Sequence, residues 1–155
     1  MESRSPDPSL RTQVPYAVAL IIADGFYRDS VSGKSTLLGT FSVIGAEQFP
    51  LKHPYMVVYF VLADGLGTLP LTIKIVRVNG IGNPDEDEVI LEASTTVTFP
   101  DVTIMQEGMF YLRDATFPVP GEYRVQLLVQ GEQLMERRIA VAKVGERGAG
   151  GEPGE

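Results

Sequence analysis

The sequence predicts an all-β protein: a single antiparallel β-sandwich of about eight strands with an immunoglobulin-like architecture. Apolar and polar residues alternate in several short segments, and turns rich in glycine, proline or aspartate separate these segments. No stretch of about ten residues or more has the apolar spacing of an amphipathic helix. A closed β-barrel is the alternative, because alternation with a period of two is common to both architectures.

A bend followed by a strand stands out between Phe117 and Val129. Two prolines and a glycine fix the bend, since proline restricts φ and glycine permits positive values. Apolar residues then alternate from Tyr123 onward, and the short link Gly131-Glu132 leads into another strand, which predicts a hairpin. Tyr123 resembles the tyrosine corner of immunoglobulin-like sandwiches, whose hydroxyl bonds to nearby backbone. Val125 stands where antibody domains carry a cysteine, so the resemblance is to the sandwich class only.

The same alternation places the other elements in order along the chain. We expect strands at Tyr16–Ala23, Ser35–Gly45, Met56–Ala63, Leu69–Val78, Val89–Phe99, Val102–Leu112, Tyr123–Val129 and Gln133–Val141. The first of these is apolar at nearly every position, as expected for a strand buried on both faces. Gly39 is expected at a bulge or a close approach of two chain segments. The predicted connections include a long polar loop at Asp24–Lys34, the segment Phe49–Pro54 and the acidic loop Asn79–Glu88.

Composition changes at both ends define the expected domain. Residues 1–13 mix Ser, Pro, Asp and Arg and predict a disordered N-terminal arm, and residues 145–155 predict a flexible tail rich in Gly and Glu. Residues 14–144 form the predicted sandwich domain. The 155 residues are enough for one domain with a single core.

The overall charge and the absence of cysteine exclude several classes of function. A formal charge of −7 disfavours binding to nucleic acid, because no basic cluster occurs beyond Arg137-Arg138, and these two side chains would point to opposite faces of a strand. With no cysteine, the chain holds no disulfide scaffold, iron–sulfur cluster or thiolate zinc site, which fits a reducing compartment. The apolar run Val14–Ala23 is far short of the roughly 20 residues that span a membrane. We therefore expect a cytoplasmic protein that requires no cofactor and does not contact a membrane.

Gly33-Lys34-Ser35 invites comparison with a nucleotide-binding loop. The full motif needs a glycine where this chain has Arg28, and a helix after the serine to cradle phosphate. The following residues indicate a strand, so we interpret the segment as a glycine turn beside a solvated lysine.

His53 is the only histidine, in a predicted loop between Lys52 and Pro54. Nucleophilic catalysis requires a base that a third group orients, and the chain has neither a cysteine nor a Gly-x-Ser-x-Gly elbow. We interpret His53 as a turn residue rather than a catalytic one.

The carboxylates Asp85, Glu86, Asp87 and Glu88 are the best candidates for a calcium site. They lack the Asp-x-Asp-x-Asp-Gly pattern, although acids at other strand ends could join them: Asp24, Asp64 and Asp101. Asp-Gly turn chemistry is the ordinary explanation for two of these three positions, and we predict that the loop is a solvated connection.

Several segments taken together resemble an uncharacterised bacterial family, a domain of unknown function of about this size. The resemblance covers roughly residues 14–143 and rests on Pro15–Leu20, Tyr27–Asp29, Gly33-Lys34, Leu37–Phe41, Phe49-Pro50, His53-Pro54, Val58-Tyr59, Phe117-Pro118, Gly121–Tyr123 and Leu134–Arg138. It implies a bacterial β-sandwich and carries over no catalytic residue, cofactor or partner.

Two functional hypotheses follow. The first is a non-catalytic protein-binding or assembly module, with homo-oligomerisation through a sheet edge as one form. The second is an enzyme, or a calcium-dependent ligand-binding domain, that uses loop carboxylates at one end of the sandwich. For the first we expect the partner to contact the segment Asp24–Lys34, because aromatic residues and arginine dominate binding hot spots. The expected contact residues are Phe26, Tyr27, Arg28, Asp29 and Lys34.

Overall fold

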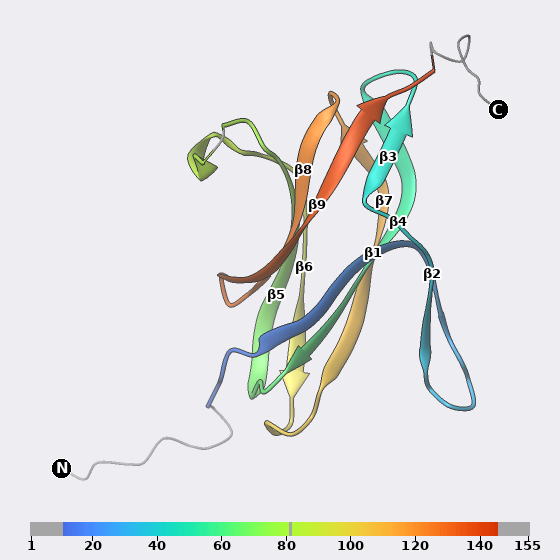
Figure 1. Cartoon of the computed structure of the whole chain (residues 1–155). Coiled ribbons are helices and arrows are strands. Elements are labelled where there is room, and N and C mark those ends of the chain that lie inside the picture. The colour runs from blue at the N-terminus through green and yellow to red at the C-terminus, as the bar shows by residue number, and fades with distance from the viewer. Residues whose placement is uncertain (1–10, 81, 146–155) are drawn as a thin grey trace.

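The chain folds into two packed β-sheets, seen nearly edge-on in Figure 1. The structure is a computed structural model that describes residues 11–80 and 82–145. Its strands are β1 (Tyr16–Arg28), β2 (Ser35–Thr40), β3 (Val43–Ala46), β4 (Leu51–Ala63), β5 (Gly67–Arg77), β6 (Glu88–Phe99), β7 (Gln106–Phe117), β8 (Gly121–Val129) and β9 (Glu132–Lys143). A 3₁₀ turn, η2 (Pro84–Glu86), lies between β5 and β6.

The first sheet has the order β2-β1-β4-β7 and the second β3-β9-β8-β5-β6. All neighbours are antiparallel except β3 and β9, which run parallel. Each sheet has two edge strands, so neither closes on itself. The predicted β-sandwich is therefore confirmed, and the barrel alternative is wrong.

The predicted strand Ser35–Gly45 is two strands in different sheets. β2 pairs with β1 in the first sheet, and β3 pairs with β9 in the second. The chain crosses between the sheets at Phe41-Ser42. Gly39, just before the crossing, has a φ of 68°, and a Cβ there would lie 2.6 Å from the Asp24 carboxylate. This confirms the close approach predicted at Gly39, a position that only glycine fills without strain.

The predicted tyrosine corner is confirmed. The Tyr123 side chain is fully buried, and its hydroxyl donates to the Val119 carbonyl at 2.6 Å and accepts from the Val119 N–H at 3.3 Å. The Phe117 ring meets the Tyr123 ring edge-on, with 4.9 Å between centroids. The corner therefore closes the turn between β7 and β8 and places both rings in the core between the sheets.

The predicted loop Asp24–Lys34 is wrong in its first half. β1 continues to Arg28 and pairs with β2, so the segment is a β-hairpin whose turn begins only at Asp29. His53 is likewise on a strand, because β4 begins at Leu51. Pro54 fits inside β4 because β1 pairs only with Val57–Ala63. The part of β4 before Val57 is therefore an edge on the side facing β1, and an edge requires no backbone N–H donor there.

The predicted arm, residues 1–13, and tail, residues 145–155, lie outside the described residues except for 11–13 and 145. Within the described part, Gln13 forms an isolated bridge with Leu66, through backbone hydrogen bonds of 2.9 and 3.1 Å. The residues in the described ranges include no helix long and apolar enough to cross a membrane.

Candidate interaction surfaces and pockets

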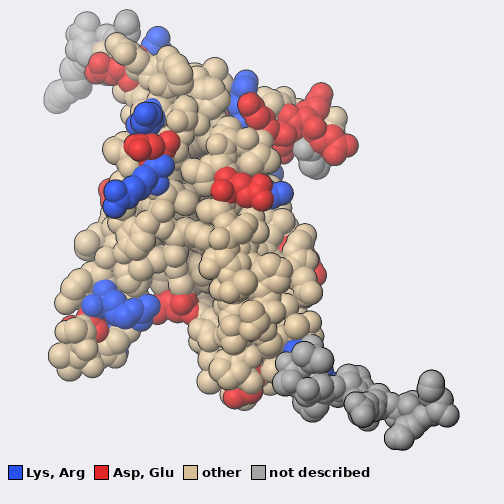
Figure 2. All heavy atoms as spheres, turned by 180° about the vertical axis from the view of Figure 1, so that it is seen from behind, with Lys and Arg blue, Asp and Glu red and all other residues tan. Residues whose placement is uncertain are grey.

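The β1–β2 hairpin, residues 24–40, folds back over the outer face of the four-stranded sheet (Figure 1). The Phe26 ring stacks on Tyr59 of β4, with 6.1 Å between the ring centroids. The Arg28 guanidinium lies 5.4 Å from the Phe26 ring centroid and forms a 2.9 Å ion pair with Glu107 of β7. These contacts anchor the hairpin to two strands of the sheet. Figure 2 shows the tip standing clear of the body, with a hollow between them.

A short polar chain connects the anchoring residues. The Tyr59 hydroxyl donates to the Glu107 carboxylate. Burial, together with this hydrogen bond, raises the pKa of Tyr59 to about 12. Burial also acts to raise the pKa of Glu107, but the hydrogen bond from Tyr59 and the charge of Arg28 outweigh it and hold that pKa below its ordinary value. Glu107 is therefore ionised at neutral pH and paired with Arg28.

Asp29 organises the hairpin turn. Its carboxylate accepts the N–H groups of Ser32 at 2.6 Å and Val31 at 3.2 Å, and the hydrogen bonds from Ser32 lower its pKa most. The Arg28 side chain donates to the Gly33 carbonyl at 2.8 Å. Gly33 has a φ of 75° and is followed by strand β2, so the Gly33-Lys34-Ser35 segment is a hairpin turn without the helix that phosphate binding requires.

The five residues predicted to contact a partner therefore divide into two groups. Phe26, Arg28 and Asp29 make contacts within the fold. The outward group is the exposed pair Tyr27 and Lys34. Sequence reasoning missed two further outward residues, Leu38 on β2 and Val31 at the tip. The exposed fraction of Leu38 is 55%, close to the 54% of Tyr27, and that of Val31 is 94%. The alternation of β2 could have revealed Leu38, but only after the segment had been recognised as a hairpin.

The outer face of the four-stranded sheet is unusually apolar. On β4, Tyr55, Val57, Tyr59 and Val61 alternate with core residues and so point outward. Tyr55 contacts Tyr111 of β7 at 5.7 Å between ring centroids. Tyr16, Val18 and Tyr111 are exposed. The expectation that the first strand is buried on both faces is wrong: its inner face is buried, and its outer face is apolar but partly open to solvent.

His53 lines a pocket of about 430 Å³ with Asp24, Phe41 and Leu51 among its other residues. Its ring lies 5.9 Å from the Phe41 ring, and its buried Nε2 has no hydrogen-bond partner in the described part of the chain. A catalytic base needs a group that orients it, and no hydrogen bond to either ring nitrogen is present among residues 11–80 and 82–145. The pocket thus offers an apolar wall rather than an assembled catalytic pair.

The acidic segment Asp85–Glu88, which runs from η2 to the start of β6, projects from the body (Figure 2, upper right). Asp87 accepts the Asn79 N–H at 3.2 Å and so helps to close the loop. Asp101 similarly accepts the Thr103 N–H at 2.7 Å, within a turn of its own. Over the described ranges, no three His, Asp or Glu side chains gather closely enough to share a metal ion.

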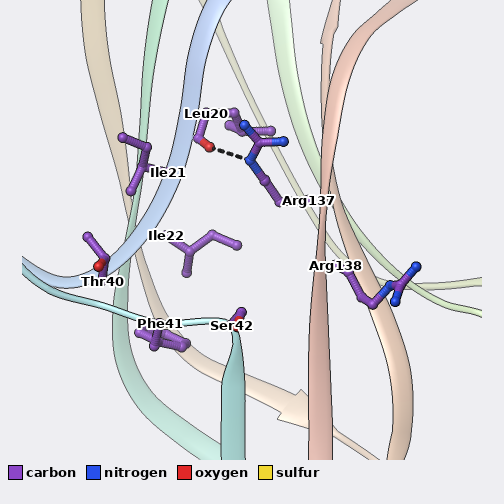
Figure 3. A pocket seen from close by; sticks show the side chains of 8 residues that line it. All are labelled: Leu20, Ile21, Ile22, Thr40, Phe41, Ser42, Arg137 and Arg138. Carbon is purple, nitrogen blue, oxygen red and sulfur yellow. Dashed lines mark hydrogen bonds between the residues drawn. The ribbon is translucent and has the colours of Figure 1, made fainter.

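A second pocket, of about 310 Å³, lies where the sheets part between β1 and β9 (Figure 3). Leu20, Ile22 and Phe41 supply apolar side chains, and Arg137 of β9 reaches across to donate its Nε–H to the Leu20 carbonyl at 3.0 Å. Arg138, the next residue, also borders the pocket, but its side chain points away from Arg137 in Figure 3, and its Nε lies 3.4 Å from a Glu122 carboxylate oxygen. Sequence reasoning took the two arginines only as opposite-facing strand residues and did not identify this pocket.

A model described as a family of unknown function (DUF6941) matches residues 18–142. No curated protein matches the chain. The match therefore covers the sandwich and supplies no activity.

Among solved structures, the Pseudomonas fluorescens alkylpurine DNA glycosylase AlkC bound to DNA with an abasic site analog is 18% identical, with a TM-score of 0.44 over 65% of this chain and 28% of that one. A Listeria innocua β-glucosidase in complex with gluconolactone is 11% identical, with a TM-score of 0.43 over 82% and 16%. An immunoglobulin-like protein from Pseudomonas aeruginosa is 14% identical, with a TM-score of 0.39 over 87% and 99%. The chain thus spans only a small part of the glycosylase and the glucosidase, and likenesses this low transfer no ligand or activity.

Proposed function

We propose that this chain, which belongs to the DUF6941 family of unknown function, is a non-catalytic protein-binding or assembly module. Its contact surface is the outward side of the β1–β2 hairpin, together with the apolar outer face beside it. The observation that carries the proposal is the exposure of Tyr27 and Leu38 on a hairpin whose other side is anchored by Phe26 and Arg28.

The anchored hairpin suits binding for an energetic reason. A free loop loses conformational entropy when it is ordered on a partner, and this loss weakens association. The contacts to Tyr59 and Glu107 order the hairpin before any partner arrives. Tyrosine adds a large, rigid surface with few rotatable bonds, which is why it recurs in binding hot spots.

The test uses full-length protein with paired substitutions. Tyr27→Ser combined with Leu38→Ser removes the exposed apolar surface and leaves the anchor intact. Val89→Ser, an exposed apolar position on β6, is the matched control. Proteins that co-purify with the wild type from its native host are identified, produced separately and titrated against all three forms. We expect the Kd to rise at least about tenfold for the hairpin variant only.

A purified partner that binds the hairpin variant and the wild type equally would refute the proposed surface. Circular dichroism melts serve as the folding control, because both forms should melt within a few degrees of the wild type. An early melt of the hairpin variant would instead show that Tyr27 and Leu38 are part of the core.

A further inference from the structure

Half of β1 has a neighbour on one side only. β4 pairs with Tyr16–Ala23, β2 pairs with Ala23–Arg28 and the Phe41 N–H bonds to Ile22, so only Tyr16–Ile21 has an open edge toward β9. The carbonyls of Leu20 and Ile22 point to this side of β1, since they accept from Arg137 and from the Phe41 N–H. In an antiparallel ladder the N–H and C=O of one residue point the same way, so the Leu20 N–H also faces the open edge.

This edge has neither the charges nor the prolines that commonly protect a sheet edge. Natural sheets discourage edge pairing with charges, prolines, short strands or local distortion. β3 is short, β6 carries Glu88 and Glu92, and β7 has Asp114 at a φ of 54°. The open half of β9, Glu132–Ile139, is charged along its length. Tyr16–Ile21 has no charge and no proline; its bulge falls at Val18 and leaves Ala19–Ile21 regular.

Arg137 acts as a substitute for the missing strand. Its Nε–H fills one backbone acceptor that a paired strand would fill. None of the ion pairs in the described part of the chain includes Arg137. Because a guanidinium carries five N–H donors, the terminal nitrogens can bind a carboxylate in a two-pronged pair. The pocket beside it has an apolar part formed by Leu20, Ile22 and Phe41, and Thr40, Ser42 and the two arginines also line it.

We propose that this open edge of β1 accepts an extended segment of a partner protein as an added strand. The segment places a branched apolar side chain in the pocket and an acidic side chain on Arg137. Main-chain hydrogen bonds give such pairing its affinity, and the side-chain pockets give it selectivity. The chain's own ends do not fit this description: residues 146–155 contain no large apolar residue, and residues 1–10 contain two prolines. This edge is separate from the hairpin surface, so either site can fail in experiment without the other.

The test is a selection from a random linear peptide library displayed on phage, against the immobilised full-length protein. We expect enriched sequences in which an acidic residue is flanked by branched apolar residues. A synthetic enriched peptide should bind Arg137→Gln about tenfold more weakly. It should bind Arg113→Gln, on β7 and outside the pocket lining, as it binds the wild type. Replacing the peptide's acid by its amide should reproduce the Arg137→Gln loss, and Arg137→Lys should retain part of the preference.

Hydrogen exchange locates the peptide. The Leu20 amide should exchange more slowly when the peptide is bound, with no change at β6 or at the outer edge of β2. An absence of enriched peptides, equal binding to Arg137→Gln, or protection at another edge would each overturn the proposal. Sedimentation of the protein without peptide tests whether a second copy of the chain occupies the edge instead. A wild-type dimer that becomes a monomer in Arg137→Gln would show this and would overturn the proposal of a different partner.

Discussion

The two sheets have equally apolar inner faces and very different outer faces. Outside the five-stranded sheet, side chains form polar cross-strand pairs, such as Thr68 with Thr98 at 2.9 Å and Thr72 with Ser94 at 3.0 Å. Arg124 there forms ion pairs with both Glu122 and Glu136. Outside the four-stranded sheet, tyrosine and valine take these positions, and the hairpin covers part of them.

The difference shows which apolar residues the fold requires. A sandwich needs one apolar face on each sheet, and the five-stranded sheet meets this need with a polar exterior. The second apolar face of β1 and β4 is therefore additional to what holds the sheets together. Surface of this kind marks contact sites in soluble proteins.

The sharpest test of the inner faces uses adjacent leucines on β8. Leu127 is fully buried between the sheets, and Leu128 points to the polar exterior. Leu127→Ala should lower the free energy of unfolding by about 2–5 kcal/mol through lost burial and the cavity left behind. Leu128→Ala should cost less than about 1 kcal/mol. Urea melts of both variants measure this, and equal midpoints would contradict the assignment of faces.

On the other exterior, Phe26→Ala should cost about 1–2 kcal/mol, because Phe26 stacks on Tyr59 and lies under Arg28. Leu38→Ala, on the outward side of the same hairpin, should cost less than about 0.5 kcal/mol. Hydrogen exchange should show faster exchange of β2 amides in Phe26→Ala alone. If both variants behave alike, the hairpin is not anchored by its inner side.

Tyr123→Phe should lower the stability by about 1 kcal/mol, because the variant loses the hydrogen bond to the Val119 carbonyl and keeps the ring. Thermal melts detect the change. The tyrosine corner joins the two sheets, so its loss should not alter either exterior, and hairpin exchange rates should match those of the wild type.

The smallest effect concerns pH. The folded-state pKa of Glu107 is lowered from 4.5, so its contribution is present above about that pH and is lost as the pH falls through the folded value. We expect NMR signals of Phe26 and Tyr59 to report loosening of the hairpin in that acidic range, while signals of the polar exterior stay unchanged. Glu107→Gln should reduce these acid-induced changes in the NMR signals. If the changes are unaltered in the variant, another carboxylate causes them.

The class of fold and the tyrosine corner could be predicted because each depends on local pattern: alternation, a Pro/Gly bend and a tyrosine at a fixed offset. The hairpin could not be predicted, because Asp24, Gly25 and Arg28 look like loop residues until the pairing of β1 with β2 is known. The strand break at Phe41-Ser42 was missed because both halves have strand-like composition. The open edge of β1 depends on which strands are neighbours, a property that no single segment encodes.

The pocket between β1 and β9 was equally impossible to predict from the sequence. Arg137 and Leu20 are far apart in the chain, and only the packing of β9 beside β1 brings them together. An arginine on a strand ordinarily indicates solvent exposure. Arg137 instead donates a hydrogen bond to the Leu20 carbonyl, and only the three-dimensional structure reveals this contact.

The parallel pairing of β3 with β9 has a consequence for the order of synthesis. Val43 pairs with Ala140, so almost the whole domain must be made before this ladder can form. Closing so long a loop is entropically costly and makes such contacts late in folding. On the ribosome, the β1–β2 hairpin is complete long before β9 emerges. β3 therefore has no partner strand through most of translation, and we expect this short strand to be the last to join its sheet.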